Sequence, residues 1–270
     1  MKDPMIVDWL SMLEQAYDLG CRKVQFIGGE PMYNPYLTDY VIKAHDLGFD
    51  FIEVYSNLTM LNTTMLDTFF DCKVNIATSF YSRHKEVHDL ITGVKGSFEK
   101  TIEGIDKVLA RGLPLRVGII KMEVNEADVK ETIEFLVRRG VNPHEIRSDK
   151  TRPVGRGGDL TPSISLEETL CGKCWQGKLC ITSYGGCYPC VFARHLEVGN
   201  ASSQSLMHIV KSQRLLNTRK LIYKVFRNYL TRDGVRVDDD ESSQCAPDCA
   251  PLCTPERPCS PVCGPSCEPA

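Results

Sequence analysis

Apolar residues recur along the first 150 residues with two alternating periods. Apolar residues three and four positions apart indicate helices that bury one face, and the short runs of Val, Ile and Phe between them indicate buried strands. After an opening helix over 5–19, the predicted strands are 23–27, 49–57, 74–80, 115–120 and 145–149, and the predicted helices between them are 36–47, 62–70, 97–111 and 125–140. This alternation predicts an α/β fold with a parallel sheet and right-handed crossovers, as an open sheet or as a closed or partial barrel.

Glycine or polar residues stand at the ends of three predicted strands. Gly-Gly-Glu-Pro occupies residues 28–31, Ser-Asn occupies 56–57, and Ser79 ends the third strand. Ligands bind at the carboxyl ends of the strands in both kinds of parallel sheet, so we expect these residues to line one pocket. An ordinary turn at 28–31, and a polar strand end facing water at Ser79, are the alternatives.

The alternation stops within the glycine-rich residues 152–160, and the rest of the chain has a different character. Gly185 and Gly186 separate two short strand-like arms and indicate a hairpin, and 203–229 has a helical pattern. An acidic linker and a tail rich in Cys and Pro follow. We therefore divide the chain into an α/β core, a hairpin-and-helix domain, and a linker with its tail, at residues 1–160, 161–230 and 231–270.

Composition excludes several classes of function. The chain has 270 residues, of which 42% are hydrophobic, with a net charge of -3 and a pI near 6.1. These values give no general attraction to nucleic acid or to anionic membranes. No apolar run approaches the roughly 20 residues that span a bilayer, and the N-terminus lacks the apolar core of a signal peptide. We expect a soluble, cytoplasmic protein with neither nucleic-acid nor membrane partners.

Eleven of the 13 cysteines fall in the last hundred residues. An odd number of cysteines in the reducing compartment that we expect indicates metal ligation rather than a disulfide framework. Cys171 and Cys174 can reach one centre from one turn, and Cys190 can join them across the hairpin. Thiolates suit both zinc and iron–sulfur clusters, and a disulfide knot or a disordered tail is the remaining alternative. The candidate ligands are Cys171, Cys174, Cys180, Cys190, Cys245, Cys249, Cys253, Cys259, Cys263 and Cys267.

Three further features are interpreted as structural. We expect Cys21 and Cys72 to be buried in the core, since free cysteine packs as a small apolar residue. His84 and His88 are four residues apart, but no third ligand completes a metal site, so we expect surface histidines. The basic residues of 211–227 indicate a solvated helix face, with an acidic peptide leader as the alternative partner. These basic residues are Lys211, Arg214, Arg219, Lys220, Lys224 and Arg227.

Six stretches of the chain, taken together, resemble one family. They are VQFIGGEP (24–31), VYSNLT (54–59), ATSFYS (77–82), DLITGVKGSFEKTIEGI (89–105), VGRGG (154–158) and ITSYGGCYPCVFARHLEVGN (181–200). The chain resembles a radical S-adenosylmethionine (radical SAM) enzyme with a C-terminal SPASM, or twitch-type, auxiliary iron–sulfur domain. The resemblance implies an α/β partial (β/α) TIM-like barrel, a radical SAM core lacking its first strand, followed by a small cysteine-rich SPASM domain.

The resemblance also implies cofactors and the residues that hold them. The backbone of residues 28–31 would bind the methionine end of S-adenosylmethionine, Ser79 would contact its carboxylate or ribose, and Asn57 would line the pocket. The hairpin pattern of the SPASM domain fits Cys171 or Cys174, Gly185 and Cys190, and its later cysteines resemble Cys249, Cys253, Cys259 and Cys263. The candidate cofactor-binding residues are therefore Gly28, Gly29, Glu30, Pro31, Asn57 and Ser79, and the C-terminal cysteines would hold [4Fe-4S] auxiliary clusters.

The implied activity is that of an oxidoreductase or peptide maturase. In the family, reductive cleavage of S-adenosylmethionine gives a 5′-deoxyadenosyl radical that abstracts hydrogen from the substrate. The implied partners are a peptide or protein substrate and a reductant such as a ferredoxin or flavodoxin.

One departure from the family pattern leaves a second interpretation open. The family's CxxxCxxC motif does not occur in these 270 residues. We expect a truncated sequence rather than a degenerate protein. The alternative function is a non-catalytic protein that holds zinc or a single iron–sulfur cluster, as a scaffold or as an electron-carrier partner.

Overall fold

The computed structural model describes residues 7–152, 165–170 and 172–232. Contacts within the chain define two compact units. The barrel unit is Lys23–Thr151, and the cysteine unit combines Met1–Arg22 with Arg152–Ala270. The proposed domain boundary at residue 160 remains a prediction.

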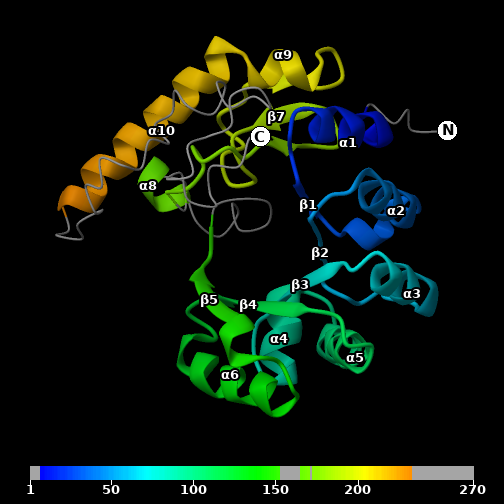
Figure 1. The fold of residues 1–270 in the computed structure, drawn as a ribbon. Helices are drawn as coiled ribbons and strands as arrows, with labels where there is room; N and C mark the ends of the chain where they lie inside the picture. The colour runs from blue at the N-terminus through cyan, green and yellow to red at the C-terminus, as the bar shows by residue number, and fades with distance from the viewer. Residues whose placement is uncertain (1–6, 153–164, 171, 233–270) are drawn as a thin grey trace. The chain divides into compact units, whose positions relative to one another are not determined.

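The barrel unit contains one sheet of five parallel strands, as the sequence predicts (Figure 1). The strands lie in the order in which they occur in the chain: β1 (Lys23–Phe26), β2 (Phe51–Tyr55), β3 (Asn75–Phe80), β4 (Leu115–Lys121) and β5 (Ile146–Lys150). The connecting helices are α2 (Leu37–Leu47), α3 (Thr63–Asp71), α4 (Lys85–Thr92), α5 (Ser97–Ala110) and α6 (Val129–Arg138). This arrangement is a partial α/β barrel, one of the architectures that the alternation allows.

Alternation along the strands gives the sheet one apolar and one polar face. Ile52, Val54, Ile76 and Phe80 are at most 3% exposed. The ring of Phe80 meets His88 of α4 and aromatic rings of α5 and α6, so this face packs against the helices. The side chains between these residues in β2 and β3 point to the opposite face, because successive strand residues alternate. That face carries the polar network described below.

Helix α4 is absent from the sequence prediction, and the adjoining turn explains why it forms. Its apolar residues Val87, Leu90 and Ile91 span little more than one turn, which is too short a pattern to predict a helix. The carboxylate of Asp89, on α4, accepts hydrogen bonds from the backbone N–H groups of Gly96 and Phe98 at 2.6 and 2.9 Å. A helix on its own leaves its first N–H groups without partners. Asp89 supplies those partners to α5, so the two helices stabilise each other.

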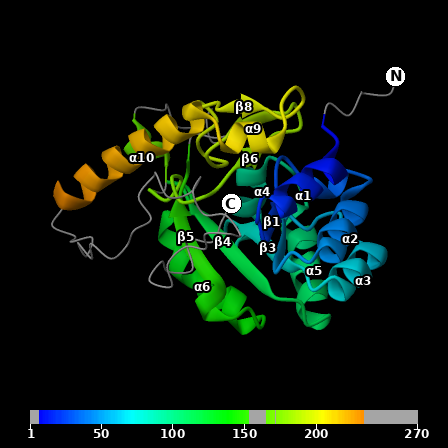
Figure 2. The same cartoon turned by 45° about the horizontal axis from the view of Figure 1, so that its top comes forward.

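The cysteine unit packs the first helix together with C-terminal elements. Its helices are α1 (Trp9–Asp18), α8 (Leu166–Thr169), α9 (Leu206–Val210) and α10 (Gln213–Arg232), and its strands are β6 (Cys180–Ile181), β7 (Gly186–Tyr188) and β8 (Gly199–Asn200). The strands form an antiparallel sheet in the order β6-β7-β8, beside which α9 and α10 lie (Figure 2). The predicted hairpin is confirmed: the backbone turns at Gly185, whose φ is 83°, and β7 begins at Gly186.

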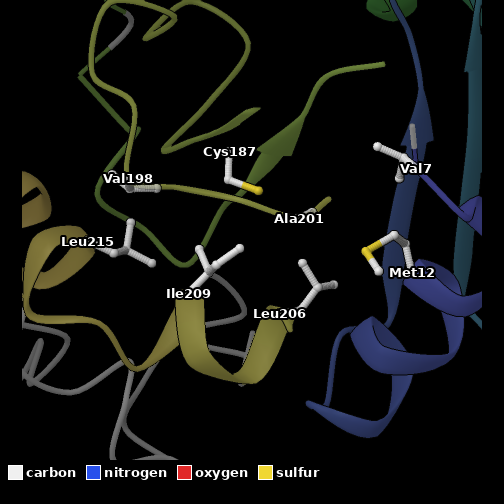
Figure 3. Close-up of a cluster of buried hydrophobic side chains, with 8 residues drawn as sticks. All are labelled: Val7, Met12, Cys187, Val198, Ala201, Leu206, Ile209 and Leu215. Atoms are coloured by element: carbon white, nitrogen blue, oxygen red, sulfur yellow. The ribbon is translucent and has the colours of Figure 1, made fainter. Parts of the chain in front are cut away.

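Two apolar clusters hold the cysteine unit together. The hairpin core joins Val7 and Met12 to the small sheet and to α9 and α10 (Figure 3). Its members are Val7, Met12, Cys187, Val198, Ala201, Leu206, Ile209 and Leu215. The thiol core consists of Leu170, Cys174, Cys190, Ala193, Ile222 and Phe226.

Several sequence expectations need correction. His88 is not on the surface: it is 1% exposed between aromatic rings. Cys72 is buried as predicted, at 7% exposed, whereas Cys21 is only half-buried. The helical stretch 203–229 is two helices, because the Ser212 hydroxyl accepts from the Leu215 N–H at 3.1 Å and starts a new helix. Within the described residues, no helix combines the length and apolar character that crossing a bilayer would require.

Candidate functional site

The loop after β1 presents bare backbone at the carboxyl edge of the sheet. Gly28 and Gly29 are exposed, and a Cβ atom built on either residue meets no atom within 4 Å. Gly28 has φ of 152°, which L side chains rarely adopt. Glycine here leaves space through which a ligand can reach the peptide groups. The two glycines therefore fit a small ligand that binds backbone, such as the amino-acid end of S-adenosylmethionine.

Glu30 fixes this loop to the end of the neighbouring strand. Its Oε1 accepts from the Met32 N–H at 3.0 Å and from the Ser56 hydroxyl at 2.6 Å. Its Oε2 accepts from the Asn57 N–H at 2.8 Å. Three hydrogen bonds to one carboxylate hold the side chain in place, so Glu30 positions the loop while the glycine backbone stays open to a ligand.

Asn57 and the residues around it form the second side of this edge. The Asn57 side-chain oxygen accepts from the Thr59 N–H and hydroxyl at 2.9 and 2.7 Å, and its backbone oxygen accepts from Thr101 at 3.2 Å. Leu58 follows with φ of 62°. The Asn57 side chain is exposed, and its oxygen already has two donors. Residues 28–31 and Asn57, which the sequence analysis selects, thus meet at one place.

Ser79 lies farther along the edge and is bonded to a residue that the sequence analysis missed. Its hydroxyl is 3.0 Å from the Tyr55 hydroxyl. Gly118 pairs with Ser79 across β3 and β4, and a Cβ atom there would lie 3.1 Å from the Tyr55 hydroxyl. Glycine at 118 therefore leaves room for the tyrosine. The alternation in FIEVY, residues 51–55, was the signal that places Tyr55 on the polar face.

An ion pair on the polar face lies beside Tyr55. Arg116 donates from Nε and Nη2 to the two Glu53 oxygens at 2.6 and 2.8 Å, and Gln25 donates to the same carboxylate. Glu53 is 3% exposed, and Arg116 is half-buried with its guanidinium 5.2 Å from the Tyr55 ring centre. The hydrogen bonds that Arg116 donates to Glu53 raise the pKa of Arg116. The interior of this half-barrel is thus polar, and hydrogen bonds connect its side chains across the strands from β1 to β4.

The second candidate centre is a pair of thiols in the cysteine unit. The sulfur atoms of Cys174 and Cys190 are 2.7 Å apart, and both residues belong to the thiol core. A disulfide bond is about 2.05 Å long, so the two sulfurs are not bonded to each other and lie side by side in the thiol core. Both residues are among the ligands that the sequence predicts, and the fold brings them together.

Cys180 and Cys187 stand on the two paired strands of the hairpin. Burial raises the pKa of the Cys187 thiol to about 11. Burial also raises the pKa of the Cys180 thiol, which the positive charge of Arg194 opposes. The sequence predicts Cys180 as a ligand and does not predict Cys187 as one. Cys187 is 0% exposed and its thiol donates to the Gly185 oxygen at 3.4 Å, so it serves the hairpin core.

The other predicted cysteine ligands lie outside the described residues. These are Cys171 and the six tail cysteines, Cys245, Cys249, Cys253, Cys259, Cys263 and Cys267. Among the residues that the structure describes, no three His, Cys, Asp or Glu side chains are grouped as a metal site. The ligand roles of Cys171 and the tail cysteines remain predictions.

One buried cation tests whether this region fits a negatively charged metal centre. Arg219 on α10 is 2% exposed, and its buried Nε atom has no hydrogen-bond partner in the described part of the chain. Burying a charge without a counter-charge is costly. A thiolate-bound cluster is anionic, so the thiol pair and Arg219 together fit such a group.

Comparison with known families identifies both regions. The sequence model of the radical SAM superfamily matches residues 5–136, and that of SPASM, an iron–sulfur cluster-binding domain, matches residues 171–250. The chain belongs to the radical SAM superfamily and carries a C-terminal SPASM domain. This confirms the resemblance on which the site expectations rest.

Curated relatives of this radical SAM chain match about half of it. The "Probable GTP 3′,8-cyclase" of Sulfurisphaera tokodaii is 29% identical over 144 residues, which are 52% of this chain and 44% of that protein. The "PqqA peptide cyclase" of Ruegeria pomeroyi is 27% identical over 143 residues, or 51% of this chain and 37% of that protein. The matched part spans less than half the length of these relatives.

Solved structures share the fold of the radical SAM chain. The anSMEcpe structure with bound AdoMet and the Kp18Cys peptide has a TM-score of 0.61 at 13% identity, covering 83% of this chain and 75% of that one. Streptococcus suis SuiB bound to S-adenosylmethionine has a TM-score of 0.60 at 15% identity, covering 98% of this chain and 71% of that one. At these identities the likeness shows the fold.

Proposed function

We propose that this chain acts in a radical SAM/SPASM maturase or oxidoreductase that modifies a peptide substrate. The observation that carries the proposal is the open backbone of Gly28 and Gly29, which Glu30 anchors at the carboxyl edge of a parallel sheet. The names of two relatives support a peptide as the substrate class, since one is a PqqA peptide cyclase and another was solved with a bound peptide.

Each part of the site has a distinct task in this proposal. The peptide groups of residues 28–31 bind the amino-acid end of S-adenosylmethionine, and Asn57 and Ser79 line the rest of its pocket. When bound and reduced, S-adenosylmethionine supplies the radical that takes a hydrogen atom from the substrate. The polar face with Tyr55, Glu53 and Arg116 orients bound groups, because its side chains are already fixed by hydrogen bonds.

The cysteine unit supplies the electron-transfer part of the proposal. Cys174 and Cys190 hold an auxiliary [4Fe-4S] cluster together with cysteines outside the described residues. A ferredoxin or flavodoxin is the proposed reductant. The sequence contains no CxxxCxxC motif, so no residue of these 270 is assigned as a ligand of the cluster that activates S-adenosylmethionine.

Binding of S-adenosylmethionine tests the proposal directly. Gly29→Val adds a side chain into space that no protein atom occupies, and Gly29 has no positive φ to strain. We expect the variant to unfold at the same temperature as the wild type but to lose the saturation-transfer NMR signal of S-adenosylmethionine. Equal binding by both proteins would remove the glycine loop from the cofactor site.

The missing CxxxCxxC motif also favours a second candidate function, a non-catalytic metal-binding scaffold or electron carrier. Metal analysis after anaerobic reconstitution separates the candidates. Iron with matching acid-labile sulfide supports the SPASM cluster. Stoichiometric zinc without iron would favour the scaffold and contradict the cluster assignment.

A further inference from the structure

A buried arginine lies on the face of α10 that packs against both clusters of the cysteine unit. Leu215 belongs to the hairpin core, and Ile222 belongs to the thiol core. Arg219 lies between them, four residues after the first and three before the second, and such spacing places side chains on one helix face. The basic pattern of α10 predicts a solvated arginine, but Arg219 is 2% exposed.

The guanidinium of Arg219 points into the segment that links two of the candidate ligands. Its Nη2 donates to the backbone oxygen of Lys178 at 3.2 Å. Lys178 lies between Cys174 and Cys180 in the sequence. Cys174 in turn contacts Cys190 in the thiol core. The arginine head group therefore lies against the chain that carries the thiols.

Nothing in the described residues balances the charge of Arg219. No described acidic side chain forms an ion pair with it, and its Nε is buried without an acceptor. Burial lowers its pKa to about 10, and no neighbouring charge opposes that effect. Arg214, on the same helix, is exposed, so the helix does not by itself bury its basic residues. A neutral thiol offers a poor acceptor, whereas a thiolate cluster offers negative charge.

We propose that Arg219 is the buried counter-charge and hydrogen-bond donor of the cluster held by Cys174 and Cys190, and that it raises the reduction potential of that cluster. The inference rests on the cluster assignment under the proposed function, and assigns a role to a residue that is not a ligand. Reduction adds one negative charge to the cluster, and a fixed positive charge in a buried site stabilises that reduced form. Hydrogen bonds and net charge around the sulfurs are established means by which proteins set such potentials.

The test compares three variants of the reconstituted protein. Arg219→Met removes the charge with a flexible side chain of similar length, and Arg219→Lys keeps the charge. Arg214→Met removes an exposed charge from the same helix and is the matched control. Each protein is analysed for iron and sulfide, and is then titrated with dithionite, the one-electron donor, while the reduced cluster is followed by electron paramagnetic resonance.

We expect Arg219→Met to shift the midpoint potential to more negative values. A tenfold change in the reduction equilibrium, which is about 59 mV for one electron, is the expected size. Arg219→Lys should lie between Arg219→Met and the wild type, and Arg214→Met should match the wild type. Loss of the cluster from Arg219→Met alone, with iron retained in Arg219→Lys, would also support the charge role.

Thermal unfolding without metal gives a second readout that a purely structural arginine would not reproduce. In apoprotein the charge has no counter-charge, so Arg219→Met should unfold at a temperature equal to or above that of the wild type. In reconstituted protein the same change should lower the unfolding temperature. This reversal of sign is the specific expectation.

The outcomes separate the two proposals. Equal potentials in iron-loaded wild type and Arg219→Met would overturn the counter-charge inference and leave the cluster assignment standing. A lower unfolding temperature of Arg219→Met in both forms, with unchanged potential, would likewise make Arg219 a packing residue. Wild-type protein that takes up no iron would overturn the cluster assignment and the inference together.

Discussion

At the scale of single residues, Glu30 anchors the binding loop without filling the space beside the loop's glycines. Its carboxylate accepts from Met32, Ser56 and Asn57, so the loop after β1 is tied to the end of β2. One of these donors is the hydroxyl of Ser56, a residue that is 2% exposed. The same hydroxyl oxygen accepts from the Leu58 N–H at 2.9 Å. The glycines before it remain uncovered because the anchoring is done by a neighbouring side chain.

Replacing Glu30 by Ala should therefore weaken both the fold and the site. A buried donor left without its acceptor costs about 1–3 kcal/mol, and we expect the free energy of unfolding in urea to fall by that amount. Binding of S-adenosylmethionine should weaken in the same variant. Glu126→Ala, at an exposed acid on the barrel unit, is the control and should change neither. Unchanged stability in Glu30→Ala would mean that the loop is held by other contacts.

His88 is a second residue whose environment the sequence does not reveal. Its Nδ1 lies 3.2 Å from the Ser97 hydroxyl, while its Nε2 is buried without a partner in the described residues. Burial lowers the pKa of His88 from 6.5 to about 4, although the negative charge of Asp89 opposes this. The aromatic rings around it come from β3 and α5, and no spacing of residues in the sequence predicts this packing.

The pKa of His88 predicts a loss of stability in mild acid. Between pH 6.5 and pH 4 the unfolded chain binds a proton at this histidine and the folded chain does not. Stability therefore falls as pH falls through that window. His88→Phe should flatten the curve of unfolding free energy between pH 7 and 4.5, whereas His144→Phe, at an exposed histidine, should not. Parallel curves for wild type and His88→Phe would contradict this origin.

The histidine effect can be separated from that of its neighbour. Hydrogen bonds from the Gly96 and Phe98 N–H groups lower the pKa of Asp89 from 3.8 to about 2. A depressed carboxyl pKa contributes stability that is lost only as pH falls from the unfolded value through the folded one. The Asp89 contribution is thus lost from about pH 4 down to pH 2, below the His88 window.

At the scale of elements, the sequence predicts the five strands and most helices because apolar period and glycine caps agree. Gly48 and Gly140, with φ of 90° and 100°, stand where α2 and α6 end. The missed elements, α4, α8 and β8, are short. Helix α4 depends on the adjoining turn at residues 96–98, and β8 forms by pairing with β7. The structure assigns a capping role to the DLITGVKGSF stretch, because Asp89 and Ser97 join α4 to α5 through a hydrogen bond of 2.9 Å.

Gly104 of α5 packs directly against Leu58, which follows the end of β2. A Cβ atom at this position would lie 2.5 Å from the Leu58 Cβ and 2.8 Å from its backbone oxygen. Alanine is intrinsically favoured over glycine in a helix, yet we expect Gly104→Ala to lower the free energy of unfolding by about 1–3 kcal/mol, because overpacking must displace backbone. Urea unfolding measures the change.

Lys100→Ala, on the exposed side of the same helix, serves as the control for Gly104→Ala and should leave stability nearly unchanged. Leu58 has a positive φ and lies next to Asn57. Movement of Leu58 should therefore also weaken the binding of S-adenosylmethionine. A stabilised Gly104→Ala would show that α5 can shift freely over this strand end.

At the scale of the whole molecule, the cysteines separate by environment. Cys190 meets a second thiol in the cysteine unit, whereas burial raises the pKa of Cys72 in the barrel unit. The spacing of Cys174 and Cys190 was enough to predict their meeting, because a hairpin brings its arms together. The sequence could not assign Cys187 or Arg219, whose burial follows from the packing of α9 and α10.

Iron content should follow this division of the cysteines. We expect Cys190→Ala to lower iron and acid-labile sulfide per chain after anaerobic reconstitution, because one thiolate of the proposed cluster is lost. Cys72→Ala is the matched control and should keep the wild-type iron content. Equal losses of iron from both variants would mean that Cys190 is no more a cluster ligand than Cys72.

The packing of α1 has a consequence for the order in which the protein can be built. Val7 and Met12 complete a cluster whose other members begin at Cys187. The barrel unit lies between these two segments of the chain. At about 5–20 residues per second on a ribosome, roughly 10–40 s pass between the synthesis of α1 and that of α9. Until then Val7 and Met12 lack the partners that bury them in the finished cysteine unit.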